Sequence, residues 1–426
     1  NSSLPPSKDD QEGRKKRRAK AANNAKRRKA RASRKKNRGA KRELVAPELV
    51  TSSEDHWPTS CGCCGERLRR RDVEAEPDRV QHFELPELRP DVHEFRMHTL
   101  RCSGCGESTK AKYPREARGP SFGPNLRALI TLLIARFRMS RRDVVEYLGD
   151  VLQVPASPGL ISKMERHTTA ALEAPYQEAM AAVQQARVVH ADETSWSYGG
   201  IPGWLWVAAT GELAVFRIDD KRGKQAAISL LGPPDRLGRV IVVDRWTAYD
   251  GFVQRQACWA HLERSAIALA ERKDEGKAVG EAILDFIKKM FSLWHRFLDG
   301  QVTRRGLACK VKGDGRRLIA RWRARAGGLP KDARRLIDGL HVAQPYLFTF
   351  TEVEGVEPTN NLAERELRRG VMWRRTSFAT RTERGRRFVE RTLTMVVSLR
   401  AQGRDIFDFL RRALDPKSKA PSLLPD

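Results

Sequence analysis

Apolar residues recur with a helical period in the stretch that follows residue 116. They lie three or four positions apart, at Leu126, Leu129, Ile130, Leu133 and Ile134. This spacing predicts a helix with one face in a core. Farther along, Ser140 and Asp143 have the spacing of a capping box, which predicts the start of a second helix. We expect residues 116–185 to be a helical domain, either a DNA-binding helix-turn-helix or a plain packing unit.

The middle of the chain carries largely apolar runs without polar alternation. Residues 188–191 lead to Asp192, and residues 240–243 lead to Asp244. Unbroken runs of this kind predict strands that are covered on both faces, each with its aspartate at the carboxyl end. Two more strands are predicted between them, over residues 203–209 and 214–218.

Helical spacing returns in the second half of the chain. Residues 262–355 are largely helical by pattern, with apolar positions at Ile283, Phe286, Ile287, Met290 and Phe291. Pro358, followed by Asn360 or Asn361 as a cap, predicts that another helix begins there. Residues 393–399 predict a helix that is buried against the sheet.

Residues 45–115 carry two cysteine pairs with the spacing of zinc knuckles. Each pair reads CxxCG, at Cys61–Gly65 and at Cys102–Gly106. Two such pairs supply the four thiolates of a tetrahedral zinc site, so we expect one structural Zn²⁺ in a zinc ribbon. The expected ligands are Cys61, Cys64, Cys102 and Cys105, and Cys63 is an alternative member of the first pair. Between the pairs, strands are predicted over residues 80–83 and 94–100.

The composition indicates a polyanionic partner. The formal net charge of the 426 residues is +28, which favours nucleic acid as the partner. Residues 1–44 form a low-complexity basic tail that we expect to be disordered when free and to contact DNA phosphates. Its densest block is Arg14, Lys15, Lys16, Arg17 and Arg18. No apolar run approaches the ~20 residues that span a bilayer, and no apolar leader is present, so we expect a cytoplasmic, nucleoid-associated protein and no membrane partner.

The two aspartates at strand ends suggest a metal site. Two carboxylates that converge at the edge of a sheet repel each other unless a cation neutralises them. Mg²⁺ prefers oxygen ligands, and a pair of ions serves both the attacking and the leaving oxygen of a phosphodiester. The alternative is that Asp192 and Asp244 only cap strands or turns. A third carboxylate is available from Glu364 or Glu366, and their spacing alone does not separate them.

Basic residues surround the third carboxylate. We expect them to contact DNA phosphates, and they are Arg365, Arg368, Arg369, Arg374 and Arg375. Cys258 and His261 are one helical turn apart and suit a metal, but packing or hydrogen bonding is the favoured interpretation. Trp196, Trp204 and Trp206 are expected to be core aromatics rather than platforms for a flipped base.

Several motifs follow one another in an order that resembles the bacterial transposases of the insertion sequence 66 family. They are His190–Thr194, Trp204–Trp206, Asp244–Tyr249, Cys258–His261 and Thr359–Arg365. The resemblance runs from the first cysteine pair to about Leu414. It implies a DDE triad of Asp192, Asp244 and Glu364, which selects Glu364 over Glu366, with two Mg²⁺ or Mn²⁺ ions in each active site.

The resemblance also implies a multi-domain α/β architecture, with an RNase H-like catalytic core that is interrupted by a helical insertion. The expected order is the basic tail (1–44), the zinc ribbon (45–115), the helical DNA-binding domain (116–185), the first part of the core (186–261), the helical insertion (262–355) and the C-terminal part of the core (356–426). The chain departs from the family at its start, where a basic tail replaces a coiled-coil-like stretch.

The implied function is metal-dependent cleavage of transposon ends and strand transfer into target DNA. Because two ends must be joined, we expect a homo-oligomer on DNA, and relatives suggest small accessory proteins as further partners. Two other functions fit the residues alone. One is a non-catalytic DNA-binding regulator on a transposase-derived scaffold, and the other is an RNase H-like nuclease that processes RNA.

Overall fold

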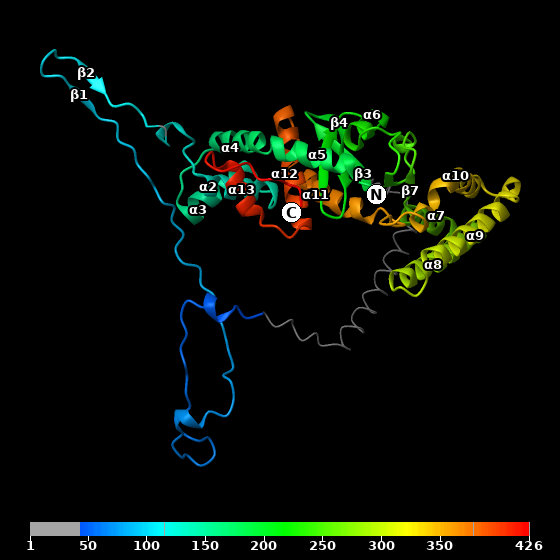
Figure 1. Ribbon diagram of the computed structural model, residues 1–426, viewed down its shortest axis with the longest axis horizontal. Helices are drawn as coiled ribbons and strands as arrows, with labels where there is room; N and C mark the ends of the chain where they lie inside the picture. Colours follow the sequence, from blue (N-terminus) through cyan, green and yellow to red (C-terminus); the bar gives the residue numbers. More distant parts are fainter. Residues whose placement is uncertain (1–42, 115, 378, 426) are drawn as a thin grey trace, which may run out of the picture. The chain divides into compact units, whose positions relative to one another are not determined.

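The computed structural model describes residues 43–114, 116–377 and 379–425 (Figure 1). The basic block of Arg14, Lys15, Lys16, Arg17 and Arg18 lies outside the described residues. The chain divides into two compact units between Glu87 and Leu88.

The first unit has little regular structure in its described part. It contains the short 3-10 helices η1 (Pro47–Leu49) and η2 (Arg70–Asp72) and a bridge between Ser60 and Arg67. None of the side chains that the structure describes within residues 43–87 is buried. The strand expected over residues 80–83 is therefore wrong. Val80 is 95% exposed, and an alternating pattern yields a strand only where its apolar face packs against other side chains.

The second unit begins with a small hairpin. Strand β1 (Thr99–Arg101) pairs antiparallel with β2 (Ser108–Lys110). The strand expected over residues 94–100 is thus confirmed only at its end. The short helix η3 (Glu116–Arg118) follows.

Four helices come next, in the stretch that was expected to be helical. They are α2 (Pro124–Ala135), α3 (Arg141–Leu152), α4 (Pro158–Ala171) and α5 (Glu173–Gln185). Ile130, Leu133 and Ile134 are buried in α2. The capping box is confirmed, because the backbone N–H of Asp143 donates to Ser140 Oγ at 3.2 Å and the Ser140 N–H donates to the Asp143 carboxylate at 3.0 Å.

A mixed five-stranded sheet occupies the centre of the second unit. Its order is β5-β4-β3-β6-β7. Its members are β3 (Val188–Tyr198), β4 (Ile201–Ala209), β5 (Ala214–Asp219), β6 (Val240–Val243) and β7 (Arg255–Ala257). Strands β3, β4 and β5 pair antiparallel, whereas β6 pairs parallel with both β3 and β7. The three strands predicted over residues 188–218 and the one over residues 240–243 are confirmed.

One strand end differs from its prediction. Asp244 directly follows β6, as expected, but β3 continues past Asp192 to Tyr198. The extension pairs with β4 as far as Tyr198 and Ile201. Gly199 and Gly200 form the turn with φ of +56° and +88°, a left-handed conformation that glycine adopts without strain. Asp192 therefore lies within a strand, because this hairpin extends the strand beyond the apolar run.

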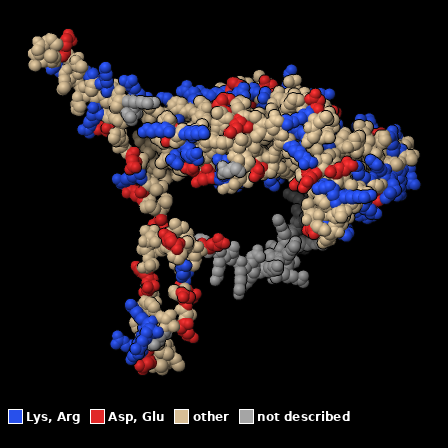
Figure 2. All heavy atoms as spheres, viewed as in Figure 1, with Lys and Arg blue, Asp and Glu red and all other residues tan. Residues whose placement is uncertain are grey.

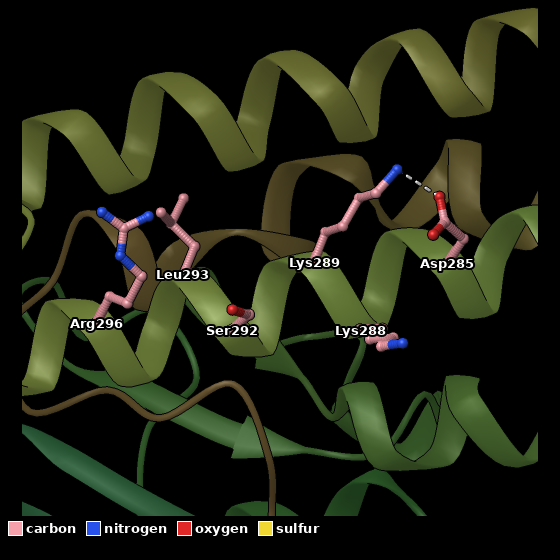
Figure 3. Close-up of a pocket in the computed structure, with 6 residues that line it drawn as sticks. All are labelled: Asp285, Lys288, Lys289, Ser292, Leu293 and Arg296. Carbon is pink, nitrogen blue, oxygen red and sulfur yellow. Dashed lines mark hydrogen bonds and ion pairs between the residues drawn. The ribbon is translucent and has the colours of Figure 1, made fainter.

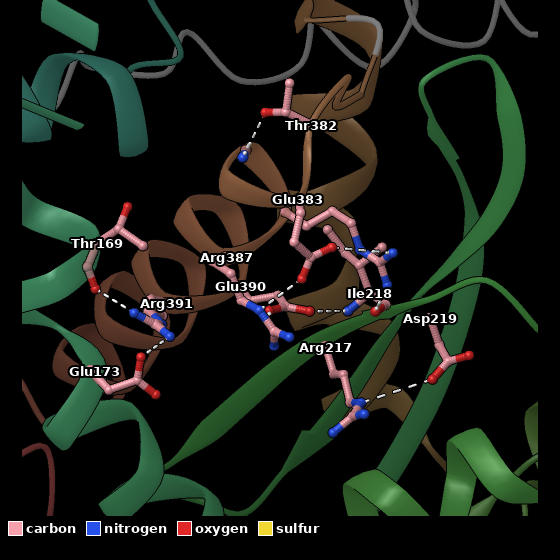
Figure 4. Close-up of polar contacts among 12 residues, drawn as sticks. Thr169, Glu173, Arg217, Ile218, Asp219, Thr382, Glu383, Arg387, Glu390 and Arg391 are labelled. Carbon is pink, nitrogen blue, oxygen red and sulfur yellow. Dashed lines mark hydrogen bonds and ion pairs between the residues drawn. The ribbon is translucent and has the colours of Figure 1, made fainter. Parts of the chain in front are cut away.

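Helix α12 (Glu383–Ala401) covers the edge strand of the sheet. Three of its side chains accept hydrogen bonds from alternate backbone N–H groups of β5: Glu390 from Ile218, Thr394 from Phe216 and Ser398 from Ala214, at 2.7, 3.0 and 3.0 Å. Figure 4 shows the first of these bonds, beside the ion pairs that Arg387 and Arg391 make. The helix predicted over residues 393–399 is confirmed. The polar side chains of α12 accept hydrogen bonds from the backbone N–H groups that no further strand among the described residues pairs with at this edge of the sheet.

The remaining helices build the two sides of the unit. They are α6 (Lys224–Leu231), α7 (Trp259–Ala270), α8 (Gly276–Leu298), α9 (Arg304–Arg323), α10 (Lys331–Leu347), α11 (Asn361–Ser377) and α13 (Ile406–Leu414), with the short η4 (Thr247–Tyr249), η5 (Ala326–Gly328) and η6 (Thr349–Thr351). Within the described part of the chain, none of the helices is long and apolar enough to cross a membrane.

Two hydrophobic cores meet at β6, one on each face of that strand. Helices α2–α5, α12 and α13 share one core with Ile241 and Val243, whereas α7–α10 share the other with Val240 and Val242. In the second core, α7 and α8 approach so closely that a Cβ added at Gly280 would lie 2.6 Å from the Ala266 carbonyl oxygen. The strands are thus covered on both faces, as their unbroken apolar runs predicted.

Candidate active site

The register of the sheet sets Asp192 beside Asp244. In the parallel pair, Val188 lies opposite Val240 and His190 lies opposite Val242. Asp192 lies two residues after His190, and Asp244 lies two residues after Val242. Adjacent parallel strands are about 4.8 Å apart, so the two carboxylates leave the sheet as neighbours.

Neighbouring carboxylates act on Asp192 at this edge. Burial is the main cause that raises the pKa of Asp192 to about 8. The negative charges of Glu193, Asp244 and Glu364 add to this rise. Asp244 and Glu364 therefore lie close enough to Asp192 for their charges to oppose its ionisation. A divalent cation among these carboxylates would reverse the effect, and the all-oxygen donor set fits Mg²⁺ or Mn²⁺.

The start of α11 brings Glu364 to the strand that carries Asp192. Asn360, which is fully buried, donates from Nδ2 to the Ala191 carbonyl at 2.7 Å. Its Oδ1 lies 3.3 Å from Nδ1 of His190, and burial lowers the pKa of that histidine to about 4. Its backbone N–H donates to Cys258 Sγ at 3.1 Å. Asn360 therefore joins β3, α7 and α11 at one point, four residues before Glu364.

The two glutamates of α11 have different surroundings. Glu364 lies 3.0 Å from Arg264 and 3.4 Å from His261 Nδ1, both on α7. Glu366 instead forms ion pairs with Arg365 and Arg369 of its own helix, at 2.9 and 3.6 Å. Glu364 therefore contacts α7, and its charge helps to raise the pKa of Asp192, whereas Glu366 pairs with arginines along α11.

Sequence reasoning missed Glu193, the neighbour of Asp192. Successive side chains of a strand point to opposite faces, and Glu193 is buried against Tyr249, whose hydroxyl donates to it at 2.5 Å. Arg222 forms an ion pair with Glu193 at 2.7 Å, and its guanidinium lies over the rings of Trp246 and Trp204 at 4.0 and 4.7 Å. The motifs at residues 190–194 and 244–249 contain Glu193 and Tyr249, but they do not show that the two side chains meet.

Comparison with models of protein families matches residues 121–387 to the family described as Transposase IS66 family. The chain belongs to this family. The matched stretch is more than half of the 426 residues and contains Asp192, Asp244 and Glu364. A comparison with curated proteins finds no match.

The two cysteine pairs of the transposase precede the matched stretch. Both adopt the same turn, in which the glycine N–H donates to the carbonyl of the first cysteine, at 3.0 Å for Gly65 and 2.9 Å for Gly106. The glycines have φ of +77°, which explains the residue type. One pair belongs to each unit, and the zinc site of Cys61, Cys64, Cys102 and Cys105 stays a prediction.

The arginines expected at phosphates fall into two groups. Arg365, Arg368 and Arg375 are exposed on α11, and Arg365 is exposed even though it pairs with Glu366. Arg369 pairs with Glu366, and Arg374 donates to the carbonyl and hydroxyl oxygens of Ser195. The exposed group is accessible to a polyanion, whereas Arg374 ties α11 to β3.

The helical region of the transposase carries further positive charge. Figure 2 shows Lys and Arg side chains gathered over α8–α10. Figure 3 shows a groove beside α8, lined by Asp285, Lys288, Lys289, Ser292, Leu293 and Arg296. Among these residues Lys289 is paired with Asp285 at 2.6 Å.

The three tryptophans considered for base stacking lie in or against the core. Trp196 and Trp206 are buried, and Trp196 Nε1 donates to Thr380 Oγ1 at 3.1 Å. Trp204 is half-buried beneath Arg222. The expectation of core aromatics is confirmed for Trp196 and Trp206.

Proposed function

We propose that this transposase cleaves the ends of a DNA element and joins them to target DNA at a DDE site of Asp192, Asp244 and Glu364. The observation that carries the proposal is that Asp192 on β3 has two further carboxylates near it: the strand register places Asp244 beside it at the end of β6, and the charge of Glu364 on α11 helps to raise its pKa. Only a cationic partner makes such a cluster favourable when all three are ionised. We assign the RNase H-like core to the central sheet with α11 and α12.

Two divalent ions, Mg²⁺ or Mn²⁺, would supply at this site the charge that activates the attacking oxygen and stabilises the leaving oxygen of a phosphodiester. The residues of the chain hold and orient the site. Asp192 and Asp244 are fixed by the sheet, and Glu364 is fixed through Asn360. Glu193, Tyr249 and Arg222 brace β3 from its other face.

DNA would approach this site over positively charged helices. Arg365, Arg368 and Arg375 lie on the helix that carries Glu364, and α8–α10 add Lys and Arg side chains (Figure 2). Such contacts hold the phosphate backbone and carry little sequence information. We propose that residues 262–355 form a helical insertion that holds DNA beside the core, and that the chain acts as a homo-oligomer because two ends must be joined.

The decisive experiment measures cleavage and strand transfer of labelled element-end DNA in Mg²⁺ or Mn²⁺. The variants Asp192→Asn, Asp244→Asn and Glu364→Gln are expected to lose roughly a hundredfold or more in rate, because metal-held charge stabilisation is worth several kcal/mol. Glu366→Gln is the matched control on the same helix and is expected to keep most of the activity. DNA binding should persist in all four variants.

Three other outcomes would overturn parts of the proposal. If Glu366→Gln abolishes cleavage while Glu364→Gln does not, the third acid is Glu366. If the intact chain binds DNA but never cuts it, with accessory proteins supplied, a regulator is the better explanation. If an RNA–DNA hybrid is cleaved in preference to duplex DNA, the chain is a nuclease that processes RNA.

A further inference from the structure

A second cluster of metal-binding atoms lies beside the carboxylates. Cys258, His261 and Glu364 each offer one ligand atom, and these three atoms all lie within 4.8 Å of one another. Cys258 is buried, and the other two are partly exposed. The cluster contains sulfur, nitrogen and oxygen donors, which sets it apart from the all-carboxylate site.

The backbone around this cluster is fixed by hydrogen bonds. Cys258 is the residue that precedes α7, and His261 lies three positions later in the first turn, so their side chains share one face of the helix. The Asn360 N–H donates to Cys258 Sγ at 3.1 Å, and the Trp259 N–H donates to the Pro358 carbonyl at 2.9 Å. Both bonds hold the start of α11 against the start of α7, so the ligand atoms are positioned before any ion arrives.

His261 provides an independent sign of a missing partner. Its Nδ1 is buried and makes no hydrogen bond with any residue that the structure describes. This nitrogen lies 3.4 Å from Oε1 of Glu364. Arg264 Nη2 donates to both carboxylate oxygens, at 3.0 Å to Oε2 and 3.3 Å to Oε1, and Oε1 is the oxygen that lies beside His261. A buried polar atom without a hydrogen bond is costly, and a metal ion would satisfy it.

We propose that Cys258, His261 and Glu364 form a site for Zn²⁺. One thiolate, one imidazole and one carboxylate are ligands that Zn²⁺ takes in tetrahedral sites, with a water or phosphate oxygen in the fourth position. Mg²⁺ disfavours sulfur and nitrogen ligands. The two sites therefore select different ions, although they share Glu364.

Sharing one glutamate makes the two sites compete. A Zn²⁺ ion on Cys258 and His261 holds Glu364 on the α7 side, where it is not available to complete the site with Asp192 and Asp244. Zn²⁺ is thus expected to inhibit cleavage that Mg²⁺ supports. This part of the inference rests on the proposed function, whereas zinc binding itself does not.

Zinc binding is tested without any activity measurement. The full chain, its Cys258→Ser and His261→Gln variants and a Cys309→Ser control are equilibrated with Zn²⁺ and desalted, and bound zinc is measured per chain. Cys309 is an exposed cysteine outside the cluster. The intact chain and the control are expected to hold one more Zn²⁺ than the two cluster variants. The four CxxCG cysteines are present in every sample, so any zinc that they bind cancels in the comparison.

Replacing Zn²⁺ with Co²⁺ gives a second readout. It reports a bond between the metal and a thiolate, so a change in side-chain packing alone does not produce the same signal. The intact chain should show a thiolate-to-cobalt absorption component that is lost in Cys258→Ser and retained in Cys309→Ser. Folding of each variant is checked by circular dichroism and thermal unfolding. Equal zinc content and equal cobalt spectra in folded Cys258→Ser and intact chains would overturn the proposed site.

Competition is then tested by adding Zn²⁺ to cleavage reactions in Mg²⁺. Cys258→Ser should need roughly tenfold more Zn²⁺ than the Cys309→Ser control to halve its own uninhibited rate, because loss of a ligand weakens metal binding at least that much. Equal inhibition of both variants would refute the competition. If the intact chain never cleaves DNA, the proposed function fails, while the zinc measurements still decide the site.

Discussion

At the scale of single residues, the charge state of Asp192 is the most sensitive property of the site. Its carboxyl is raised in pKa to about 8, mainly by burial. A carboxyl with a raised pKa binds its proton more tightly in the folded chain than in the unfolded chain, so it favours folding at low pH. This contribution is lost as the pH rises through the folded-state pKa.

We therefore predict a pH effect that depends on metal. With metal removed by a chelator, the melting temperature of the intact chain should fall between about pH 5 and pH 8, and Asp192→Asn should show a smaller fall. Added Mg²⁺ should reduce the fall of the intact chain, since a bound cation favours the ionised carboxylate. Thermal unfolding across this pH range is measured for the intact chain in chelator, for Asp192→Asn in chelator and for the intact chain with Mg²⁺. Identical pH profiles for the two proteins in chelator would contradict the electrostatic account.

We predict that loss of the Asn360 side chain lowers activity even though Asp192, Asp244 and Glu364 are all present. Asn360→Ala removes the bonds to Ala191 and His190 and should allow Glu364 to move. A misplacement of about 1 Å can cost roughly a hundredfold in rate, so cleavage should fall by about that factor while DNA binding persists. Asn361→Ala is the matched control, because Asn361 is exposed. Kinetics and binding are compared for the pair, and equal rates would refute the role of the junction.

At the scale of elements, α12 and β5 stabilise each other through side chains rather than through a further strand. Thr394→Val leaves the buried Phe216 N–H without its acceptor, which should cost about 1–3 kcal/mol in the free energy of unfolding. Thr392→Val is the control, because Thr392 is equally buried but donates to the Phe388 carbonyl of its own helix. Chemical denaturation compares the two variants. A Thr392→Val loss as large as that of Thr394→Val would contradict the specific role of the edge contact.

The elements also show what the sequence was able to predict. Helix α2, the capped start of α3 and the strand before Asp244 follow from local spacing, and all three are confirmed. The strand through Asp192 was predicted too short, because its extension depends on pairing with residues 201–206. Residues 80–83 alternate like a strand, but Val80 has no core to pack against. Local patterns therefore predict an element where its own apolar positions are buried, but they do not predict how far pairing extends a strand or whether a core is available.

The residues of the candidate site were likewise predictable only in part. Asp192 and Asp244 were singled out because each follows an apolar run. Glu364 was separated from Glu366 only through the family resemblance. The partners of Asn360 and Glu193 were not predictable, because Asn360 meets Ala191 and Glu193 meets Tyr249 across long stretches of chain. Such contacts depend on the completed fold and leave no periodic signal in the sequence.

At the scale of the whole molecule, the excess of basic residues predicts how DNA binding responds to salt. Removal of residues 1–44 should weaken binding to any DNA sequence. It should also make the dependence of log K on log salt shallower, by about 0.9 for each phosphate that the tail would otherwise neutralise. Titrations at several salt concentrations measure the slope. An unchanged slope after truncation would show that the tail does not bind phosphates.

The cover that α12 provides on β5 also limits how copies of the chain can assemble. An open edge strand is a ready template for a strand from another molecule. On β5, Glu390, Thr394 and Ser398 already occupy the alternate backbone donors that such a strand would need. Two copies that meet on DNA are therefore barred from joining their sheets through β5 into one continuous sheet. Any contact between copies would therefore use a surface other than the β5 edge.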